Sequence, residues 1–348
     1  VNILIVTVGS RDSGCGHIQR MSVLAQELVR RGHRVGFVTL ANTSGEKRLW
    51  NLFPIGGVDI SYIKSLDNMG NVSNYLKSHA VADVVIMDLE HGPPENLIRY
   101  AKSHSRKTVV VGGVGFAIHD KKAIDELVDL QVYQSVLVSS MNQDRVTKNM
   151  LVGPEYLIID EVYPNSRRLA DNGWDDSMHS WIGGVQREGV LISMGGSDPH
   201  NITQSIVNFV REQHLRASAV IGPGMKHNGI SADECILQQS NLASAIGRHK
   251  YLITALGMTV YEALCLGIPV ACTAWSKDHE ETALWLRDRD YVAYLGLWDN
   301  IDWDTLKGDM DNCLIEGDYP DWNDAVSAGR KLIDGLGVHR VVDAIEAL

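Results

Sequence analysis

Short apolar runs rich in β-branched residues alternate with helically spaced segments along most of this chain, which restricts the fold more than any other feature. Such alternation is typical of β-α-β units, in which crossover helices join parallel strands. The expected strands cover residues 1–7, 34–40, 58–63, 81–87, 107–111, 132–138, 189–194, 218–221, 251–254 and 270–273. The expected helices cover residues 17–31, 199–212, 257–266, 278–287 and 302–313, and a last helical pattern spans 322–348.

The stretch 153–184 is poorer in apolar runs and separates two such series, and 348 residues favour two domains. We predict a first Rossmann-like domain at 1–155, a linker and entry to the second domain at 156–185, and a second Rossmann-like domain at 186–329. The helical pattern at about 330–348 can pack back onto the first domain. The carboxyl ends of the strands in two such doubly wound parallel sheets are expected to face a central cleft, because ligands bind at that edge.

The composition of the chain restricts the kinds of partner that it can bind. The hydrophobic fraction is 45% and the charged fraction is 22%, as in ordinary globular proteins. A net charge of -11 disfavours an extended nucleic-acid or anionic membrane surface. No apolar run approaches the roughly 18 residues of a membrane span, so we expect a soluble, cytoplasmic protein. The five cysteines (Cys15, Cys235, Cys265, Cys272 and Cys313) lack metal-ligand spacing, which favours reduced thiols over structural zinc.

The first candidate motif joins the first strand to the first helix. It reads Asp12-Ser13-Gly14-Cys15-Gly16-His17-Ile18-Gln19-Arg20. Gly14 and Gly16 let the backbone turn tightly and approach a ligand. His17 lies in the first helical turn, where the helix dipole favours a neutral imidazole, so it is a candidate general base. Alternatively, the glycines form a plain turn and His17 only caps or packs. Gln19 breaks the GxGxxG pattern of dinucleotide-binding sites.

The second motif also follows a strand and precedes a helix. It reads Ser193-Met194-Gly195-Gly196-Ser197-Asp198-Pro199. Gly195, Gly196 and Ser197 can turn backbone N–H groups toward an anion. Ser197 or Asp198 is a good N-cap and Pro199 a good first helical residue, so a capped turn is the alternative explanation.

The third motif opens the helix expected at 257–266. The amides of Gly257 and Met258 and the hydroxyl of Thr259 can hold a diphosphate. Glu262 lies one turn deeper on the same face, where its carboxylate can accept hydrogen bonds from both hydroxyls of a ribose. A solvated glutamate on an ordinary helix is the alternative.

The fourth motif, Asp278-His279-Glu280-Glu281, follows the strand at 270–273. Adjacent carboxylates can indicate metal binding or acid–base chemistry. No DxD partner stands nearby, so we expect a solvated helix start and no metal site.

Together these segments resemble the GT-B superfamily, and most of all the PseG/SpsG-like family of UDP-sugar hydrolases and glycosyltransferases; MurG is a more distant relative. Further matching elements are Arg31-Gly32-His33, Gly153-Pro154-Glu155-Tyr156, Ile221-Gly222-Pro223, Glu262-Ala263-Leu264 and Gly267-Ile268-Pro269. The resemblance implies that His17 is the base, that Thr259 and Glu262 contact diphosphate and ribose, and that Ile221 and Gly222 lie beside the uracil.

The chain also departs from that family near the expected cleft. His279 stands where many relatives carry a glutamine that contacts the sugar. Ala255-Leu256-Gly257-Met258 replaces a Gly-Gly-Ser-type loop, and Gly112-Gly113-Val114-Gly115 replaces an acidic pair. The sequence therefore does not identify the sugar or the acceptor.

The predicted function is a metal-independent, inverting glycosyltransferase that uses a nucleotide-diphosphate sugar, expected to be UDP-linked, as its substrate and needs no other cofactor. One alternative is a UDP-sugar hydrolase, in which water takes the place of the acceptor. Another is a nucleotide-sugar-binding protein without catalysis.

Overall fold

The computed structural model describes residues 1–9, 16–40, 58–63, 82–89, 92–112, 126–137, 149–171, 180–181, 185–225, 229–237, 242–314 and 320–348. The chain divides into two compact units. Unit 1 comprises Val1–Ile158 and Leu336–Leu348, and unit 2 comprises Ile159–Gly335. No helix among the described residues is both long and apolar enough to span a bilayer.

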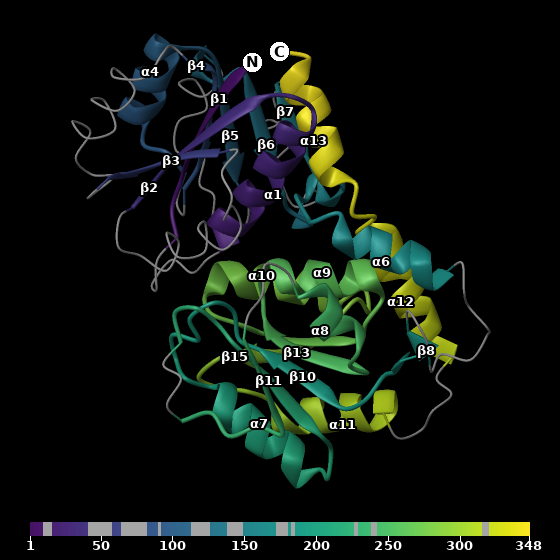
Figure 1. The fold of residues 1–348 in the computed structure, drawn as a ribbon. Helices are drawn as coiled ribbons and strands as arrows, with labels where there is room; N and C mark the ends of the chain where they lie inside the picture. Colours follow the sequence, from purple (N-terminus) through teal and green to yellow (C-terminus); the bar gives the residue numbers. More distant parts are fainter. Residues whose placement is uncertain are drawn as a thin grey trace. The chain divides into compact units, whose positions relative to one another are not determined.

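Unit 1 contains a seven-stranded sheet with the order β3-β2-β1-β4-β5-β6-β7, in which all neighbours are parallel (Figure 1). Its strands are β1 (Asn2–Thr7), β2 (Arg34–Leu40), β3 (Val58–Ile63), β4 (Ala82–Asp88), β5 (Ser105–Gly112), β6 (Leu130–Tyr133) and β7 (Met150–Val152). Its helices are α1 (Gly16–Arg30), α4 (Glu95–His104), the 3-10 turn η3 (Pro154–Tyr156) and α13 (Gly337–Glu346).

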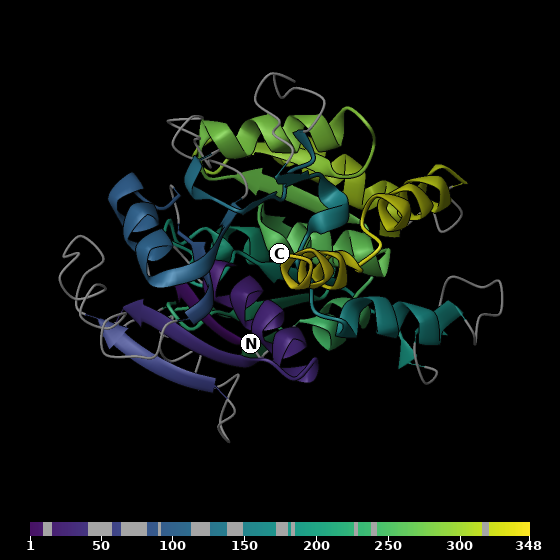
Figure 2. The same ribbon diagram turned by 90° about the horizontal axis from the view of Figure 1, so that it is seen from above.

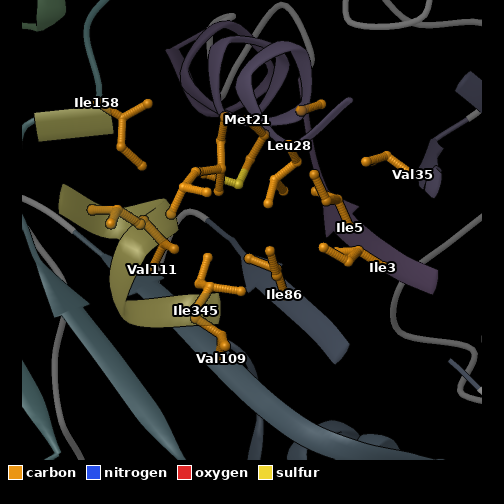
Figure 3. Packing of buried hydrophobic residues seen from close by; sticks show 14 of the residues in the cluster. Ile3, Ile5, Met21, Leu28, Val35, Ile86, Val109, Val111, Ile158 and Ile345 are labelled. Atoms are coloured by element: carbon orange, nitrogen blue, oxygen red, sulfur yellow. The ribbon is translucent and has the colours of Figure 1, made fainter. Parts of the chain in front are cut away.

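The core of unit 1 forms because the central strands are apolar on both faces. Ile3 and Ile5 of β1 point toward α1 and α13, where they pack with Met21, Leu28 and Ile345 (Figure 3). The alternate residues of the same strands pack against α4 on the other face. A strand buried on both sides reads as a continuous apolar run, which explains why these strands are visible in the sequence.

Helix α13 lies beside α1 (Figure 2), and ion pairs join the two segments. Arg31 pairs with Asp343 at 2.5 Å and with Glu346 at 2.8 Å, and His33 Nε2 lies 2.9 Å from Glu346. Glu27 on α1 is buried and lies 3.1 Å from His339 Nδ1 of α13. Arg31-Gly32-His33, part of the family resemblance, therefore fixes the C-terminal helix to unit 1.

Unit 2 contains a six-stranded parallel sheet with the order β12-β11-β10-β13-β14-β15. Its strands are β10 (Val190–Ser193), β11 (Ala217–Ile221), β12 (Glu234–Leu237), β13 (Tyr251–Ala255), β14 (Val270–Ala274) and β15 (Ala293–Leu297), and β8 (Ser180–Trp181) pairs separately with β9 (Val185–Gln186). Its helices are α6 (Val162–Asp171), α7 (Thr203–Glu212), α8 (Ala243–Gly247), α9 (Met258–Leu266), α10 (Lys277–Arg287), α11 (Trp303–Leu314) and α12 (Pro320–Leu332). Figure 1 shows α7 and α11 on one face of the larger sheet and α8, α9 and α10 on the other.

The predicted fold class, two doubly wound parallel-sheet domains, is confirmed, but three predicted elements are wrong in extent. The strand expected at 132–138 ends at Tyr133, because the Ser135 N–H turns back to the Tyr133 carbonyl. The helix expected from Pro199 begins at Thr203, because Asp198 and Asn201 adopt positive φ angles of 41° and 54°. The last helical pattern is two helices, α12 and α13, with Gly335 between them at a φ of 76°.

Candidate functional site

The switch point of the unit 1 sheet lies between β1 and β4, where the strand order reverses. Ligands of doubly wound sheets bind outside the carboxyl ends of the strands at such a point. Thr7 at the end of β1 is the register partner of Asp88 at the end of β4. The helix after β1 begins at Gly16, which places His17 in its first turn. Gly14 lies outside the described residues.

Three side chains meet there. His17 Nδ1 lies 2.7 Å from Asp88 Oδ1. Arg20 binds the same carboxylate through two groups, Nε to Oδ2 and Nη2 to Oδ1, each at 2.5 Å. Asp88 is fully buried, whereas the His17 side chain keeps 17% of its surface exposed. The structure thus adds two residues, Asp88 and Arg20, that the sequence analysis did not assign to the site.

These contacts decide the ionisation of Asp88 and the tautomer of His17. Burial alone would raise the pKa of Asp88, but the charges of Arg20 and His17 and their hydrogen bonds lower that pKa to about 2. A lone pair on His17 Nδ1 would be repelled by this carboxylate, so Nδ1 carries the proton and donates it to Asp88. Arg20 Nη2, 2.9 Å from Nδ1, is then a packing contact rather than a donor to that nitrogen. In the neutral imidazole the lone pair then lies on Nε2, which is the arrangement of a histidine base oriented by an aspartate.

Unit 2 has its own switch point, between β10 and β13. The loop after β10 contains Gly195 at a φ of 76°, and it packs against the loop after β11. The Gly224 N–H donates to the Gly196 carbonyl at 2.8 Å. A Cβ on Gly222 would lie 2.4 Å from that same oxygen, so only glycine fits this position. The structure therefore brings Gly195, Gly196 and Ser197 together with Gly222 and the end of β11 at Ile221.

Asp198 in the same motif lies before α7 and forms hydrogen bonds with its first residues. Its Oδ1 accepts from the Ile202 N–H at 3.1 Å, and its Oδ2 accepts from the Thr203 N–H at 3.1 Å and the Thr203 hydroxyl at 2.6 Å. The carboxylate thus accepts from the first amides of α7, but the N-cap residue is Ile202, not the predicted Ser197 or Asp198. The negative charge of Asp198 is directed to α7.

Helix α9 follows β13 at the switch point. Gly257 precedes it in extended conformation, no side chain caps its first turn, and that turn holds no acidic residue. The Thr254 hydroxyl donates to the Ser193 carbonyl at 2.6 Å, which ties the ends of β13 and β10 together. Met258 and Thr259 are half-buried, and Glu262 is buried one turn further in, with 7% of its surface exposed.

His279 lies at the start of α10, after β14, which neighbours β13. Ser276 caps this helix by accepting from the His279 N–H. Burial lowers the pKa of His279, so its imidazole is neutral at neutral pH. Glu280 pairs with Lys277 at 2.6 Å and accepts from the Tyr294 hydroxyl at 3.0 Å. Through these contacts Glu280 links α10 to β15 and pairs with a lysine of its own helix.

Among the motif residues that depart from the family, Gly112 ends β5, and Gly113-Val114-Gly115 lie outside the described residues. Of the five cysteines, Cys15 also lies outside them. The described cysteines, Cys235, Cys265, Cys272 and Cys313, form no disulfide with one another. Burial raises the pKa of Cys265 and of Cys272 to about 12, so neither forms a thiolate at neutral pH.

No protein-family model matches the chain. It is similar to the spore coat polysaccharide biosynthesis protein SpsG of Bacillus subtilis, at 22% identity over all of this chain and 98% of that protein. It is also similar to the uncharacterized protein MJ1062 of Methanocaldococcus jannaschii, at 25% identity over 78% of this chain. That match spans only 55% of MJ1062, so the chain corresponds to about half of that relative.

Solved structures define the class of fold. The glycotransferase of kitacinnamycin matches 99% of this chain and 98% of its own at a TM-score of 0.66 and 15% identity. MurG of Acinetobacter baumannii matches 100% of both chains at a TM-score of 0.63 and 11% identity. The UDP-GlcNAc 2-epimerase of Neisseria meningitidis, bound to UDP-GlcNAc, matches 100% of both chains at a TM-score of 0.61 and 13% identity. With its two parallel α/β sheets, the chain has the GT-B fold, and the expected relationship to SpsG and MurG fits these matches.

Proposed function

We propose that this chain is a glycosyltransferase that uses a nucleotide-diphosphate sugar, with UDP as the nucleotide, and that His17 is its general base. The observation that carries the proposal is the His17–Asp88 pair at the switch point of unit 1. Glycosyltransferases among the fold neighbours and the UDP-GlcNAc bound to one neighbour support the substrate class.

In the proposed step, the acceptor oxygen forms a bond with the anomeric carbon as the bond from that carbon to the diphosphate oxygen breaks. The acceptor proton passes to His17 Nε2, and UDP leaves with the bonding electrons. A single displacement inverts the anomeric configuration. Asp88 stays ionised and stabilises the imidazolium that forms, as in other histidine–aspartate pairs.

Unit 2 holds the donor in this proposal. The amides of Gly257, Met258 and Thr259 face the diphosphate at the start of α9, and the Gly195–Ser197 loop adds further donors. Backbone dipoles of this kind stabilise the leaving charge without a metal ion. Glu262 accepts from the ribose, Ile221 and Gly222 lie beside the base, and His279 contacts the sugar.

Hydrolysis is the second candidate, because the same base would deprotonate water as readily as an acceptor hydroxyl. The likeness to the PseG/SpsG-like family favours it. Incubation with UDP-glucose or UDP-N-acetylglucosamine, with chelator and without acceptor, separates the two reactions. Stoichiometric release of free sugar indicates a hydrolase, and acceptor-dependent release of UDP indicates a transferase. Binding without turnover under any acceptor condition indicates a binding protein.

The base is tested by His17→Ala, with His214→Asn as the control, since His214 is an exposed histidine of unit 2. We expect turnover to fall by about 10³-fold in His17→Ala, because a positioned base contributes about 10²- to 10⁴-fold, while UDP binding persists. Unchanged turnover in His17→Ala would remove His17 from the mechanism.

A further inference from the structure

Two buried threonines lie in line with Asp88, and the proposed reaction gives them no role. Thr7 ends β1 and is the register partner of Asp88 at the end of β4. In the neighbouring strand β2, Val38 pairs with Val6 of β1. The next residue of β2, Thr39, therefore lies beside Thr7 on the side away from Asp88. These three residues form one row across the carboxyl ends of β2, β1 and β4.

The side chains of this row point to the face of the sheet that α1 covers. Side chains alternate between the two faces along a strand, so each member of the row shares its face with the residue two positions earlier. Those residues are Phe37, Ile5 and Ile86, which pack in the core cluster beneath α1, where Figure 3 labels Ile5 and Ile86. The row thus replaces an apolar layer with a polar one, and none of the surface of its three residues is exposed.

Both threonine hydroxyls are buried and have no hydrogen-bond partner within the part of the chain that the structure describes. A buried hydroxyl without a hydrogen bond destabilises the fold, and the large majority of such groups bond to protein or to ordered water. Asp88 has bonding capacity left as well. Its Oδ1 accepts from His17 and Arg20, whereas Oδ2 accepts from Arg20 alone among the described residues, and a carboxylate has about four lone-pair positions.

The chemistry of the row identifies its ligand. Neighbouring strands lie about 4.8 Å apart, which is too far for a direct bond between aligned oxygens but suits one bridging water. The ionised Asp88 can only accept, so the ligand must donate to it, whereas a hydroxyl can donate or accept. Arg20 Nη2 already lies 2.5 Å from this carboxylate, and its charge disfavours a second cation. Water meets these conditions, because buried waters typically make about three hydrogen bonds to polar groups.

We propose that Thr7 and Thr39 hold buried water that donates a hydrogen bond to Asp88 Oδ2, and that both threonines are positioning residues for the His17 base. This inference rests on the proposed role of the His17–Asp88 pair. One water bridges Thr39 to Thr7, and a second bridges Thr7 to Oδ2. With donors on both oxygens the carboxylate is fixed in rotation, so it stays aligned with the imidazole that it orients.

The direct test is a crystal structure of the full chain at a resolution that shows ordered water, for the wild type and Thr7→Val. Valine has the shape of threonine without its hydroxyl. We expect a water oxygen about 2.8 Å from Thr7 Oγ1 and from Asp88 Oδ2 in the wild type, and its loss in Thr7→Val. A wild-type structure without water between these two groups would overturn the inference, whatever the activity of the protein.

The kinetic test compares turnover and UDP affinity in Thr7→Val and Thr39→Val. We expect turnover to fall about tenfold in Thr7→Val and about threefold in Thr39→Val, which is one water further from Asp88, with UDP affinity within about twofold in both. Thr7→Ser, which restores the hydroxyl, should recover most of the turnover. Thr108→Val is the matched control, because Thr108 is also buried with an unpartnered hydroxyl but lies on the α4 face of the same sheet, beside Val85.

Asp88→Asn distinguishes a failure of this inference from a failure of the proposed function. If Asp88→Asn retains wild-type turnover, the proposed base pair fails. If Asp88→Asn lowers turnover while Thr7→Val and Thr39→Val retain it, the base pair stands and the positioning role is overturned. The same holds if the threonine variants lose only thermal stability. If Thr7→Val does not fold, Thr39→Val decides in its place, and wild-type turnover in that variant overturns the inference.

Discussion

The switch points of the two sheets have the same topology but carry different polar groups. In unit 1, three side chains meet at the ends of β1 and β4, and all three are ionisable: His17, Asp88 and Arg20. In unit 2, the ends of β10 and β13 carry glycine loops and the uncapped start of α9, and Asp198 is directed to α7. A proton acceptor needs a side chain with an oriented lone pair, whereas a diphosphate can be held by backbone dipoles. The comparison therefore supports the proposed division, with the chemistry in unit 1 and donor binding in unit 2.

The largest expected effect separates these two roles. Asp88→Asn should lower turnover by about 10³- to 10⁴-fold, because the amide no longer fixes the histidine tautomer, and should change UDP affinity by less than about twofold. Steady-state kinetics and calorimetry measure the two quantities. Asp83→Asn is the control, since Asp83 lies at the amino end of the same strand and bonds to Asn2. A parallel loss of UDP affinity in Asp88→Asn would contradict the division of roles.

A substitution in the glycine loops of unit 2 should have the opposite effect, which is a loss of UDP affinity. Gly222→Ala places a methyl group against the Gly196 carbonyl and must displace the Gly195–Ser197 loop. We expect UDP affinity to fall by about 10²-fold, because the loop amides lose their alignment with the diphosphate. Gly308→Ala, where a Cβ meets nothing within 4 Å, is the control. Wild-type affinity in a folded Gly222→Ala protein would exclude this loop from the site.

Acid should also distinguish the two units. In unit 1, burial of Glu27 is outweighed by its bonds to Arg30, Arg31 and His339, which lower its pKa to about 2, as that of Asp88 is lowered. Such groups stabilise the fold above their unfolded pKa, and this stability is lost as the pH falls toward 2. In unit 2, hydrogen bonds lower the pKa of Asp233, Glu280 and Asp302, but these acids are exposed or half-buried. Burial raises the pKa of Asp160 and of Asp309, so the protonation of these two costs the fold nothing.

We therefore expect unit 1 to open before unit 2 between about pH 4.5 and pH 2, with a loss on the order of 2 kcal/mol for each of Glu27 and Asp88. Hydrogen exchange followed by mass spectrometry measures the order of opening. Glu27→Gln should flatten the pH dependence of unit 1. Earlier exchange in unit 2 on acidification would contradict the assignment.

The sequence allowed prediction of the sheets because their central strands are buried on both faces, as in β13, where all five residues are buried. It did not reveal α4 or α6, whose helical patterns are short and polar, or β7, which has three residues. His17 was recognisable from its place after a strand and two glycines. Asp88 was not, because 71 residues separate it from His17 and only the pairing of β1 with β4 brings them together.

The smallest expected effect concerns Asp198. It is the ionised side chain nearest in sequence to the proposed diphosphate loop of unit 2, so it is the strongest test of the difference between the units. Its carboxylate follows the Gly195–Ser197 loop directly and would repel a diphosphate if it faced one. Asparagine tolerates the positive φ of this position and retains one capping oxygen, so Asp198→Asn should cost about 1 kcal/mol of stability and leave UDP affinity within about twofold. Thermal unfolding and calorimetry measure both, and Asn201→Asp, which adds a carboxylate at the neighbouring positive φ, serves as the comparison. A gain of about tenfold in UDP affinity on Asp198→Asn would mean that a fixed negative charge faces the diphosphate, and the backbone amides of unit 2 would then not be the only charges and dipoles acting on it.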